Sequence, residues 1–255
     1  MTTDRRFSSA LQALTELQTN AQPAPAVPAL STVLAKLGAV PAQALFLGIA
    51  SDGLPVLLNL SDPHPGPMLI SGDAGSGKTA FLKTLAQAAI QMHRSDDVQF
   101  GVITNYADEW ASLEATSHQA GIFSVGHAGT SQFIHSLAGW AHSNKNTDQW
   151  ILLLVDDLES VASMDPETVQ DFRWLLLRGP ARRVWPIITL NAPRYGQVIA
   201  WLQNFRTRIF GRIANARVAE ALGGDRLSSF DQLEAGTQFS LREKDKWLRL
   251  WLPSC

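Results

Sequence analysis

Residues 72–79 constrain the fold of this chain more than any other stretch. They read Gly-Asp-Ala-Gly-Ser-Gly-Lys-Thr and match the phosphate-binding pattern G-x-x-x-x-G-K-T. The apolar run at 67–71 predicts a buried strand, and the apolar spacing of 80–90 predicts a helix. A strand, a glycine-rich loop and a helix, in this order, form the context that this pattern requires. The sequence therefore predicts a nucleotide site, and the flanking elements disfavour the alternative of a glycine turn that matches by chance.

The chemistry of phosphate binding explains the residue types in this stretch. Glycines let main-chain N–H groups point inward around a phosphate chain, and the following helix presents its positive end to the same phosphates. We expect Lys78 to reach the β- and γ-phosphates of ATP and the hydroxyl of Thr79 to bind Mg²⁺. The expected nucleotide-binding residues are Gly72, Asp73, Ala74, Gly75, Ser76, Gly77, Lys78, Thr79 and Ala80.

A second set of polar residues follows two apolar strands further along the chain. The run 151–155 ends at Asp156 and Asp157, an arrangement in which the first acid holds Mg²⁺. Asp157 occupies the position of a residue that orients the attacking water, and Glu159 is the alternative for that role. Asn191, at the end of the next strand, is expected to sense the γ-phosphate. The alternatives are acids that cap a helix and an asparagine in an ordinary turn.

Composition limits the setting in which the protein works. The only cysteine is Cys255, which excludes a disulfide framework and a cysteine metal site and favours a reducing compartment. No stretch approaches the roughly 18 apolar residues that a membrane span needs, and no signal peptide follows the polar start of the chain. We therefore expect a cytoplasmic protein without membrane insertion.

The order of apolar segments predicts the domain organisation. Residues 1–30 are expected to form an amphipathic helix at 5–19 on a Pro/Ala linker, and 31–255 a single ATP-binding domain. Alternating strands and helices predict an α/β fold with a mostly parallel sheet covered by helices on both faces. Strands are expected at 44–49, 54–60, 98–104, 121–125, 150–155, 184–190, 207–214, 236–241 and 247–252, and helices at 31–37, 107–117, 129–142, 166–178, 195–203 and 216–222. The helix at 5–19 has two open interpretations, docking on another protein or subunit and folding back on its own domain.

Arginines are concentrated in one part of an otherwise acidic chain. Residues 171–217 hold 9 arginines and one acid, whereas 1–170 hold 7 Lys and Arg against 16 Asp and Glu. Arginines stabilise phosphate charge from a neighbouring subunit and also grip nucleic-acid backbones. Arg182 and Arg183 are the expected catalytic arginines, and a solvated basic face is the alternative.

Several segments together resemble the FtsK/SpoIIIE–HerA superfamily of motor ATPases. The resemblance covers about residues 40–252 and is carried by 44–79, by the strand and acids at 151–161, and by 178–194 and 204–224. It implies a RecA-like P-loop core, a ring that is usually a hexamer, ATP bound between subunits, and DNA or protein threaded through the pore. The chain departs from the family pattern at Asp157, where glutamate is usual, and at Asn191, where glutamine is usual.

These observations predict a Mg-ATP-binding ATPase that forms a homo-oligomeric ring and translocates or remodels double-stranded DNA. One alternative is a slowly hydrolysing scaffold or switch that recruits a protein partner through its N-terminal helix. Another is a motor for protein secretion, because secretion ATPases share this core.

Overall fold

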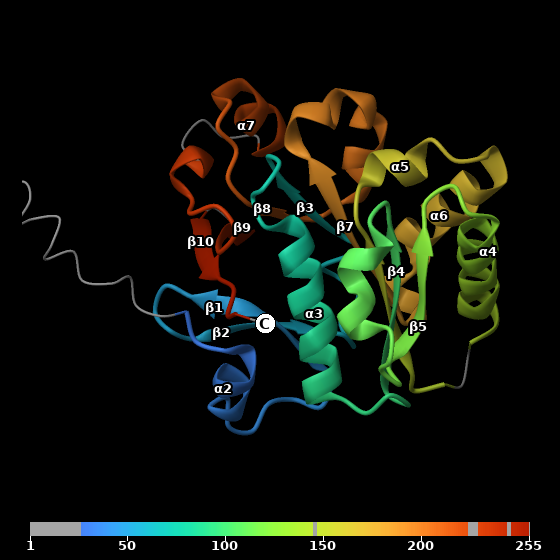
Figure 1. Cartoon of the computed structure of the whole chain (residues 1–255), viewed down its shortest axis with the longest axis horizontal. Helices are drawn as coiled ribbons and strands as arrows, with labels where there is room; N and C mark the ends of the chain where they lie inside the picture. Colours follow the sequence, from blue (N-terminus) through green and yellow to red (C-terminus); the bar gives the residue numbers. More distant parts are fainter. Residues whose placement is uncertain (1–26, 145–146, 224–228, 244–245, 255) are drawn as a thin grey trace, which may run out of the picture.

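A computed structural model describes residues 27–144, 147–223, 229–243 and 246–254 of the chain (Figure 1). The helix expected at 5–19 lies outside these residues. The two ends of the described chain lie together, because Leu30 N donates to Ser254 O at 2.9 Å and Ser254 N donates to Pro28 O at 3.0 Å. Residues 28–30 are thus attached to the main domain.

Strands and helices alternate along the central part of the chain, as expected. The strands are β1 (Ala44–Ala50), β2 (Pro55–Asn59), β3 (Met68–Gly72), β4 (Val98–Thr104), β5 (Gln119–Ser124), β6 (Trp150–Val155), β7 (Val184–Asn191), β8 (Thr207–Phe210), β9 (Gln238–Glu243) and β10 (Lys246–Trp251). The α-helices are α2 (Leu30–Ala35), α3 (Lys78–Met92), α4 (Ala128–Ser143), α5 (Leu158–Ala162), α6 (Pro166–Arg178) and α7 (Ala216–Gly223). The 3₁₀-helices are η1 (Ala107–Leu113), η2 (Pro180–Arg182), η3 (Ala192–Gln197), η4 (Ile199–Asn204) and η5 (Phe230–Gln232).

All ten of these strands join one mixed sheet in the order β2-β1-β10-β9-β8-β3-β7-β6-β4-β5. Strands β8, β3, β7, β6, β4 and β5 are parallel, and the hairpins β1–β2 and β9–β10 add an antiparallel edge. The strands of both hairpins were expected, but the pairing of one hairpin with the other was not. Ile49 of β1 pairs with Trp251 of β10, so the two hairpins lie side by side in the sheet. The α/β fold with a mostly parallel sheet is confirmed.

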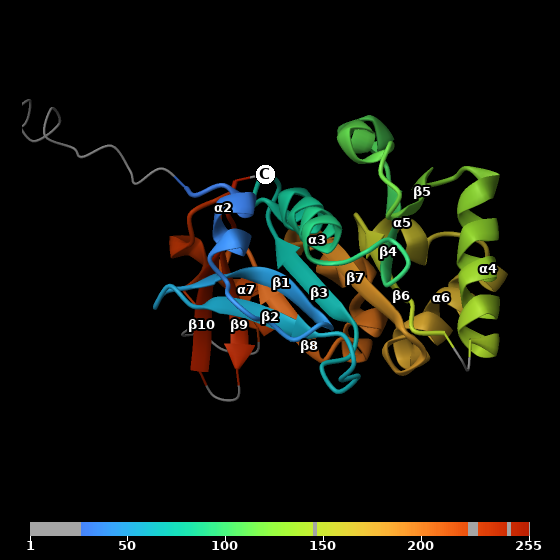
Figure 2. The ribbon, with the colours of Figure 1, turned by 90° about the horizontal axis from the view of Figure 1, so that it is seen from below.

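Helices cover both faces of the sheet (Figures 1 and 2). Met68 and Ile70 of β3 face a core that contains α2, α3 and η1. Leu69 faces the opposite core, which contains α4, α5, α6, η4 and α7. Since successive strand residues point to opposite faces, a strand buried on both sides must be apolar throughout, which explains the continuous apolar runs.

Three expected elements differ in the structure. Residues 107–113 and 192–204 form 3₁₀-helices instead of α-helices. The first of those in 192–204, η3, contains Pro193 and Gly196, two residues that disfavour an α-helix. Strand β8 ends at Phe210, because the chain then turns toward the P-loop. There Asp73 N donates to Arg212 O at 2.9 Å.

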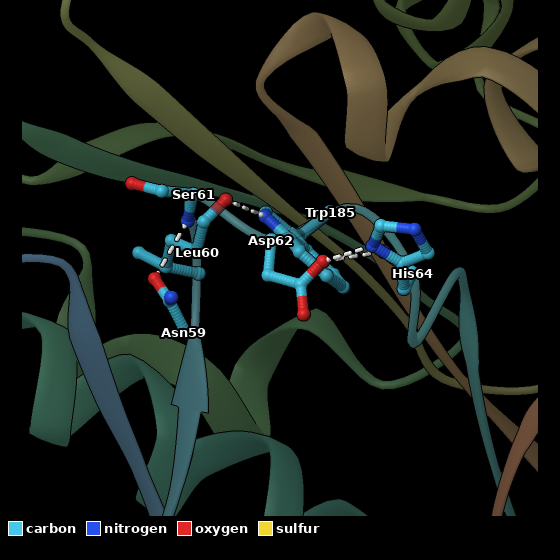
Figure 3. Close-up of polar contacts among 6 residues, drawn as sticks. All are labelled: Asn59, Leu60, Ser61, Asp62, His64 and Trp185. Carbon is cyan, nitrogen blue, oxygen red and sulfur yellow. Dashed lines mark hydrogen bonds and ion pairs between the residues drawn. The ribbon is translucent and has the colours of Figure 1, made fainter.

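The loop between β2 and β3 is fixed to the sheet (Figure 3). The buried indole Nε1 of Trp185 donates to Leu60 O at 3.1 Å. Ser61 N donates to the side chain of Asn59, and His64 N to the side chain of Asp62, each at 3.0 Å. These local turns fix the direction in which the chain enters β3 and its P-loop.

Candidate nucleotide-binding site

The P-loop leaves the carboxyl end of β3 and requires glycine at two positions. Gly75 has φ 74° and Gly77 has φ 92°, a left-handed region that other residues rarely adopt. A Cβ at Gly77 would also lie 2.7 Å from the Cα and O of Gly236, whose N–H donates to Ser76 O at 3.2 Å. The loop before β9 therefore supports the P-loop from outside.

Lys78 begins helix α3 and folds its side chain back over the loop. Its ammonium donates to the carbonyl oxygens of Gly72 at 3.1 Å and Asp73 at 2.8 Å. Burial lowers the pKa of Lys78, and the nearby carboxylates of Asp157 and Asp156 oppose that shift. A partly buried cation held at the mouth of a glycine loop is suited to phosphate oxygens.

Thr79 and Asp156, the expected Mg²⁺ ligands, lie in direct contact. Thr79 Oγ1 donates to Asp156 Oδ2 at 2.8 Å, and Thr189 Oγ1 donates to Asp156 Oδ1 at 2.7 Å. Asp156 is 8% exposed at the end of β6. A hydroxyl and a carboxylate are the hard oxygen ligands that Mg²⁺ takes in phosphate sites, so this donor set fits the metal.

The two further acids lie beside the same group. Burial raises the pKa of Asp157, and the charge of Asp156 adds to that shift. Burial likewise raises the pKa of Glu159, whose two carboxylate oxygens are buried without a hydrogen-bond partner among the described residues. The positive charges of Lys78 and Arg194 lower the pKa of both acids. Glu159 thus presents two unused acceptors near the expected phosphate site.

Asn191 ends β7 next to the P-loop strand, as its position in the sequence suggests. It is paired in register with Gly72, the first residue of the loop. Its Oδ1 is buried and has no hydrogen-bond partner in the part of the chain that the structure describes. The structure therefore brings Lys78, Thr79, Asp156, Asp157, Glu159 and Asn191 to one edge of the sheet.

Arg182 and Arg183 lie at the opposite edge, just before β7 begins. The Arg183 guanidinium lies 5.0 Å from the ring centroid of Trp150 and contacts Asp148 at 3.2 Å. Arg182 has an exposed side chain. Neither residue belongs to the phosphate edge of its own chain, so a role at a phosphate requires a neighbouring subunit.

The remaining arginines do not form one surface. Arg206 precedes β8 at the amino edge, while Arg194 and Arg212 follow β7 and β8 at the carboxyl edge. Arg208 is half-buried between them and donates to Leu222 O at 3.0 Å and to Leu202 O at 2.8 Å. Burial lowers its pKa. Arg208 therefore stabilises the fold of its own chain.

The sequence did not predict two supporting contacts, one made by Thr189 and one made by the side chain of Asp73. Thr189 is a polar residue in the otherwise apolar run that leads to Asn191, and only the fold shows that its hydroxyl contacts Asp156. Asp73 accepts from Ala214 N at 2.7 Å through its side chain, which attaches the P-loop to the segment after β8. Both contacts join residues far apart in sequence, and no local pattern indicates them.

The fold and the site define a P-loop nucleotide-binding protein with a RecA-type core. Residues 44–122 match the model of the FtsK/SpoIIIE family. The expected resemblance to this family is confirmed over these residues, which include the P-loop and its flanking strand and helix. No curated protein sequence matches the chain.

Solved structures of secretion and conjugation proteins have a similar fold. EccC (ATPases 2 and 3) of Thermomonospora curvata, in complex with a signal sequence peptide, is 17% identical with a TM-score of 0.69, over 91% of this chain and 44% of that one. EssC (ATPases 2 and 3) of Geobacillus thermodenitrificans is 13% identical with a TM-score of 0.71, over 91% and 47%. The pCW3 conjugation coupling protein TcpA, a monomer with ATPγS, is 14% identical with a TM-score of 0.67, over 91% and 71%. The chain thus spans less than half the length of the EccC and EssC structures.

Within the described residues, no helix combines the length and the apolar character needed to cross a bilayer.

Proposed function

We propose that this protein is a slowly hydrolysing Mg-ATPase that forms a ring in a cytoplasmic protein-transport assembly. The observation that carries the proposal is the contact of Thr79 with Asp156 beside Lys78, at the carboxyl edge of an FtsK-type sheet. Loop N–H groups and Lys78 would bind the phosphates, and Thr79 with Asp156 would hold Mg²⁺. Bound Mg²⁺ would supply neutralising charge to the transferred phosphoryl group.

Slow hydrolysis follows from the length of the acid at position 157. Aspartate there is one methylene shorter than the glutamate usual in the family, which shortens its reach toward an attacking water. Apart from the main-chain N–H of Glu159 itself, no donor among the described residues reaches its two buried carboxylate oxygens, and an attacking water could donate to them. We therefore assign the orientation of water to Glu159, with Asn191 contacting the γ-phosphate or its water.

In a ring, an arginine of the neighbouring chain would supply a positive charge to the transferred phosphoryl group. Arg182 is the better candidate, because Arg183 already contacts Trp150 and Asp148 within its own chain.

Mixing two inactive variants tests the role of Arg182. Lys78→Ala has an intact Arg182 and Arg182→Ala has an intact P-loop, so mixed rings should hydrolyse ATP faster than either variant alone. An Arg178→Ala variant, with the same loss of charge on an exposed side chain nearby, should keep wild-type turnover. No recovery on mixing would contradict the assignment.

Protein is the favoured cargo. EccC, a structural relative, is solved with a signal sequence peptide, and the exposed arginines of this chain are divided between two edges of the sheet. Double-stranded DNA remains the second candidate, because residues 171–217 carry 9 arginines against one acid. The N-terminal residues 1–30 are the proposed attachment point for a protein partner.

Steady-state ATP hydrolysis with and without double-stranded DNA separates the two cargoes, with Lys78→Ala as the blank. We expect tight Mg-ATP binding and slow turnover that DNA does not change. Turnover that rises several-fold with DNA and disappears in Lys78→Ala would favour the DNA motor. Absence of nucleotide binding by the wild-type protein would overturn both.

A further inference from the structure

The hydroxyl of Thr189 contacts both acids that follow β6. Its Oγ1 donates to Asp156 Oδ1 at 2.7 Å and accepts from Asp157 N at 2.8 Å. Thr189 is fully buried in β7, where its strand neighbours Ile188 and Leu190 are apolar. A single hydroxyl therefore uses its one proton and one lone pair on two successive residues of another strand.

This contact completes the fixation of the Asp156 carboxylate. Thr79 of α3 holds Oδ2, and Thr189 of β7 holds Oδ1. With both oxygens bound from different elements, the carboxylate of Asp156 cannot rotate freely. Oδ2 of Asp156 faces Thr79, which is the other candidate ligand of Mg²⁺.

The same hydroxyl supports an unusual main-chain conformation. Asp157 has φ 88° and ψ 99°, a conformation that residues with a side chain rarely adopt. Such a conformation persists only where surrounding contacts impose it. The bond from Asp157 N to Thr189 is one such contact, and it ties the direction of the second acid to the position of the first.

We propose that Thr189 is a positioning residue that orients Asp156 toward Mg²⁺ and holds the Asp157 peptide. The inference rests on the proposed function, since it concerns the metal of that site. Valine has the shape of threonine and suits a buried strand, so the fold itself does not require a hydroxyl here. The hydroxyl of Thr189 therefore acts on Asp156 and Asp157.

The test measures metal affinity separately from hydrolysis. A fluorescent ADP analogue is titrated onto wild type, Thr189→Val, Thr189→Ser and Thr130→Val, first in EDTA and then with increasing Mg²⁺. Thr130 is a matched control, because it is fully buried and its hydroxyl donates to Ser124 O at 2.7 Å. The Mg²⁺ concentration needed for half-maximal enhancement of binding is the readout.

Thr189→Val should bind ADP in EDTA within about twofold of wild type but need about 10-fold or more Mg²⁺, the usual loss when a residue behind a metal ligand is removed. Thr189→Ser should return the Mg²⁺ requirement to within about threefold of wild type. Thr130→Val should match wild type. A wild-type Mg²⁺ requirement in Thr189→Val overturns the inference while leaving the proposed function intact. If Thr189→Val does not fold, Thr189→Ala is titrated in its place. A wild-type protein that binds no nucleotide overturns both proposals.

Discussion

Gly236 lies so close to Gly77 that no Cβ fits at Gly77, which joins the P-loop to the loop before β9. The separation would be 2.7 Å to the Cα and to the carbonyl oxygen of Gly236. Gly75 has a similar left-handed φ but open space around its Cα. A side chain at Gly75 would therefore meet main-chain strain alone, whereas a side chain at Gly77 would meet the same strain and a steric contact.

Alanine at each glycine should show this difference in the thermal unfolding of the nucleotide-free protein. Gly75→Ala incurs only the left-handed strain, about 1 kcal/mol, which lowers Tm by about 2–4 °C. Gly77→Ala adds overpacking of about 1–3 kcal/mol and should lower Tm at least twice as far. Equal Tm values for the two variants would contradict the contact with Gly236.

Arg208 should matter for stability and Arg206 should not. Arg208→Met removes two hydrogen bonds from a charged donor to Leu222 O and Leu202 O. The loss, reduced because the guanidinium is only half-buried, is about 2 kcal/mol and lowers Tm by about 4–8 °C. The exposed Arg206 gives the control, since Arg206→Met should change stability by less than about 0.5 kcal/mol. A small effect at Arg208 would indicate that its side chain is free for another role.

Glu159→Gln should stabilise the protein at neutral pH. Burial raises the pKa of Glu159 in the folded state, so the folded protein binds this proton more tightly than the unfolded chain. Stability from that proton is present below the ordinary glutamate pKa and is lost as pH rises through the folded pKa. At pH 7.5 the variant avoids a charge in this site, a gain that screening keeps near about 1 kcal/mol, or about 2–4 °C in Tm. The Tm difference from wild type should shrink as the pH falls toward 4.5, and a difference that grows instead would reverse the sign of the shift.

Turnover should depend on Glu159 more than on Asp157. Loss of a group that orients or deprotonates water lowers kcat by about 10²–10⁴-fold, which we expect for Glu159→Gln. Asp157→Asn should lower kcat by less than about 10-fold, and Asp157→Glu should raise it if the shorter side chain limits the reaction. Single-turnover hydrolysis with saturating Mg-ATP checks the order of these variants. The reverse order would assign the water to Asp157.

The nucleotide site was predictable because its chemistry is local. Eight consecutive residues must wrap a phosphate chain, and the residue types that can do so are few. The placement of Asp156 and Asn191 at one edge could be predicted because each comes at the end of an apolar run, and parallel strands end at one edge of the sheet. The α/β fold class could be predicted from the alternation of strand and helix patterns along the chain.

The contacts that escaped prediction all join distant segments. Thr189 touches Asp156, and Gly236 touches Gly77, but neither pair leaves a pattern within a short window of sequence. The division of the arginines between two edges depends on strand direction, which the count of 9 arginines cannot reveal. The 3₁₀-helices differ from the expected α-helices by hydrogen-bond spacing, to which apolar periodicity is insensitive.

The pairing of β1 with β10 has a consequence for how the chain reaches its fold. Ile49 and Trp251 are partners across the sheet, although about 200 residues separate them along the chain. Until β10 is made, β1 carries an open edge of unpaired N–H and C=O groups, to which other strands can add. The pairing of β1 with β10 is thus a late and slow step of folding, and the nascent chain is exposed to aggregation or chaperone capture until β10 has been made.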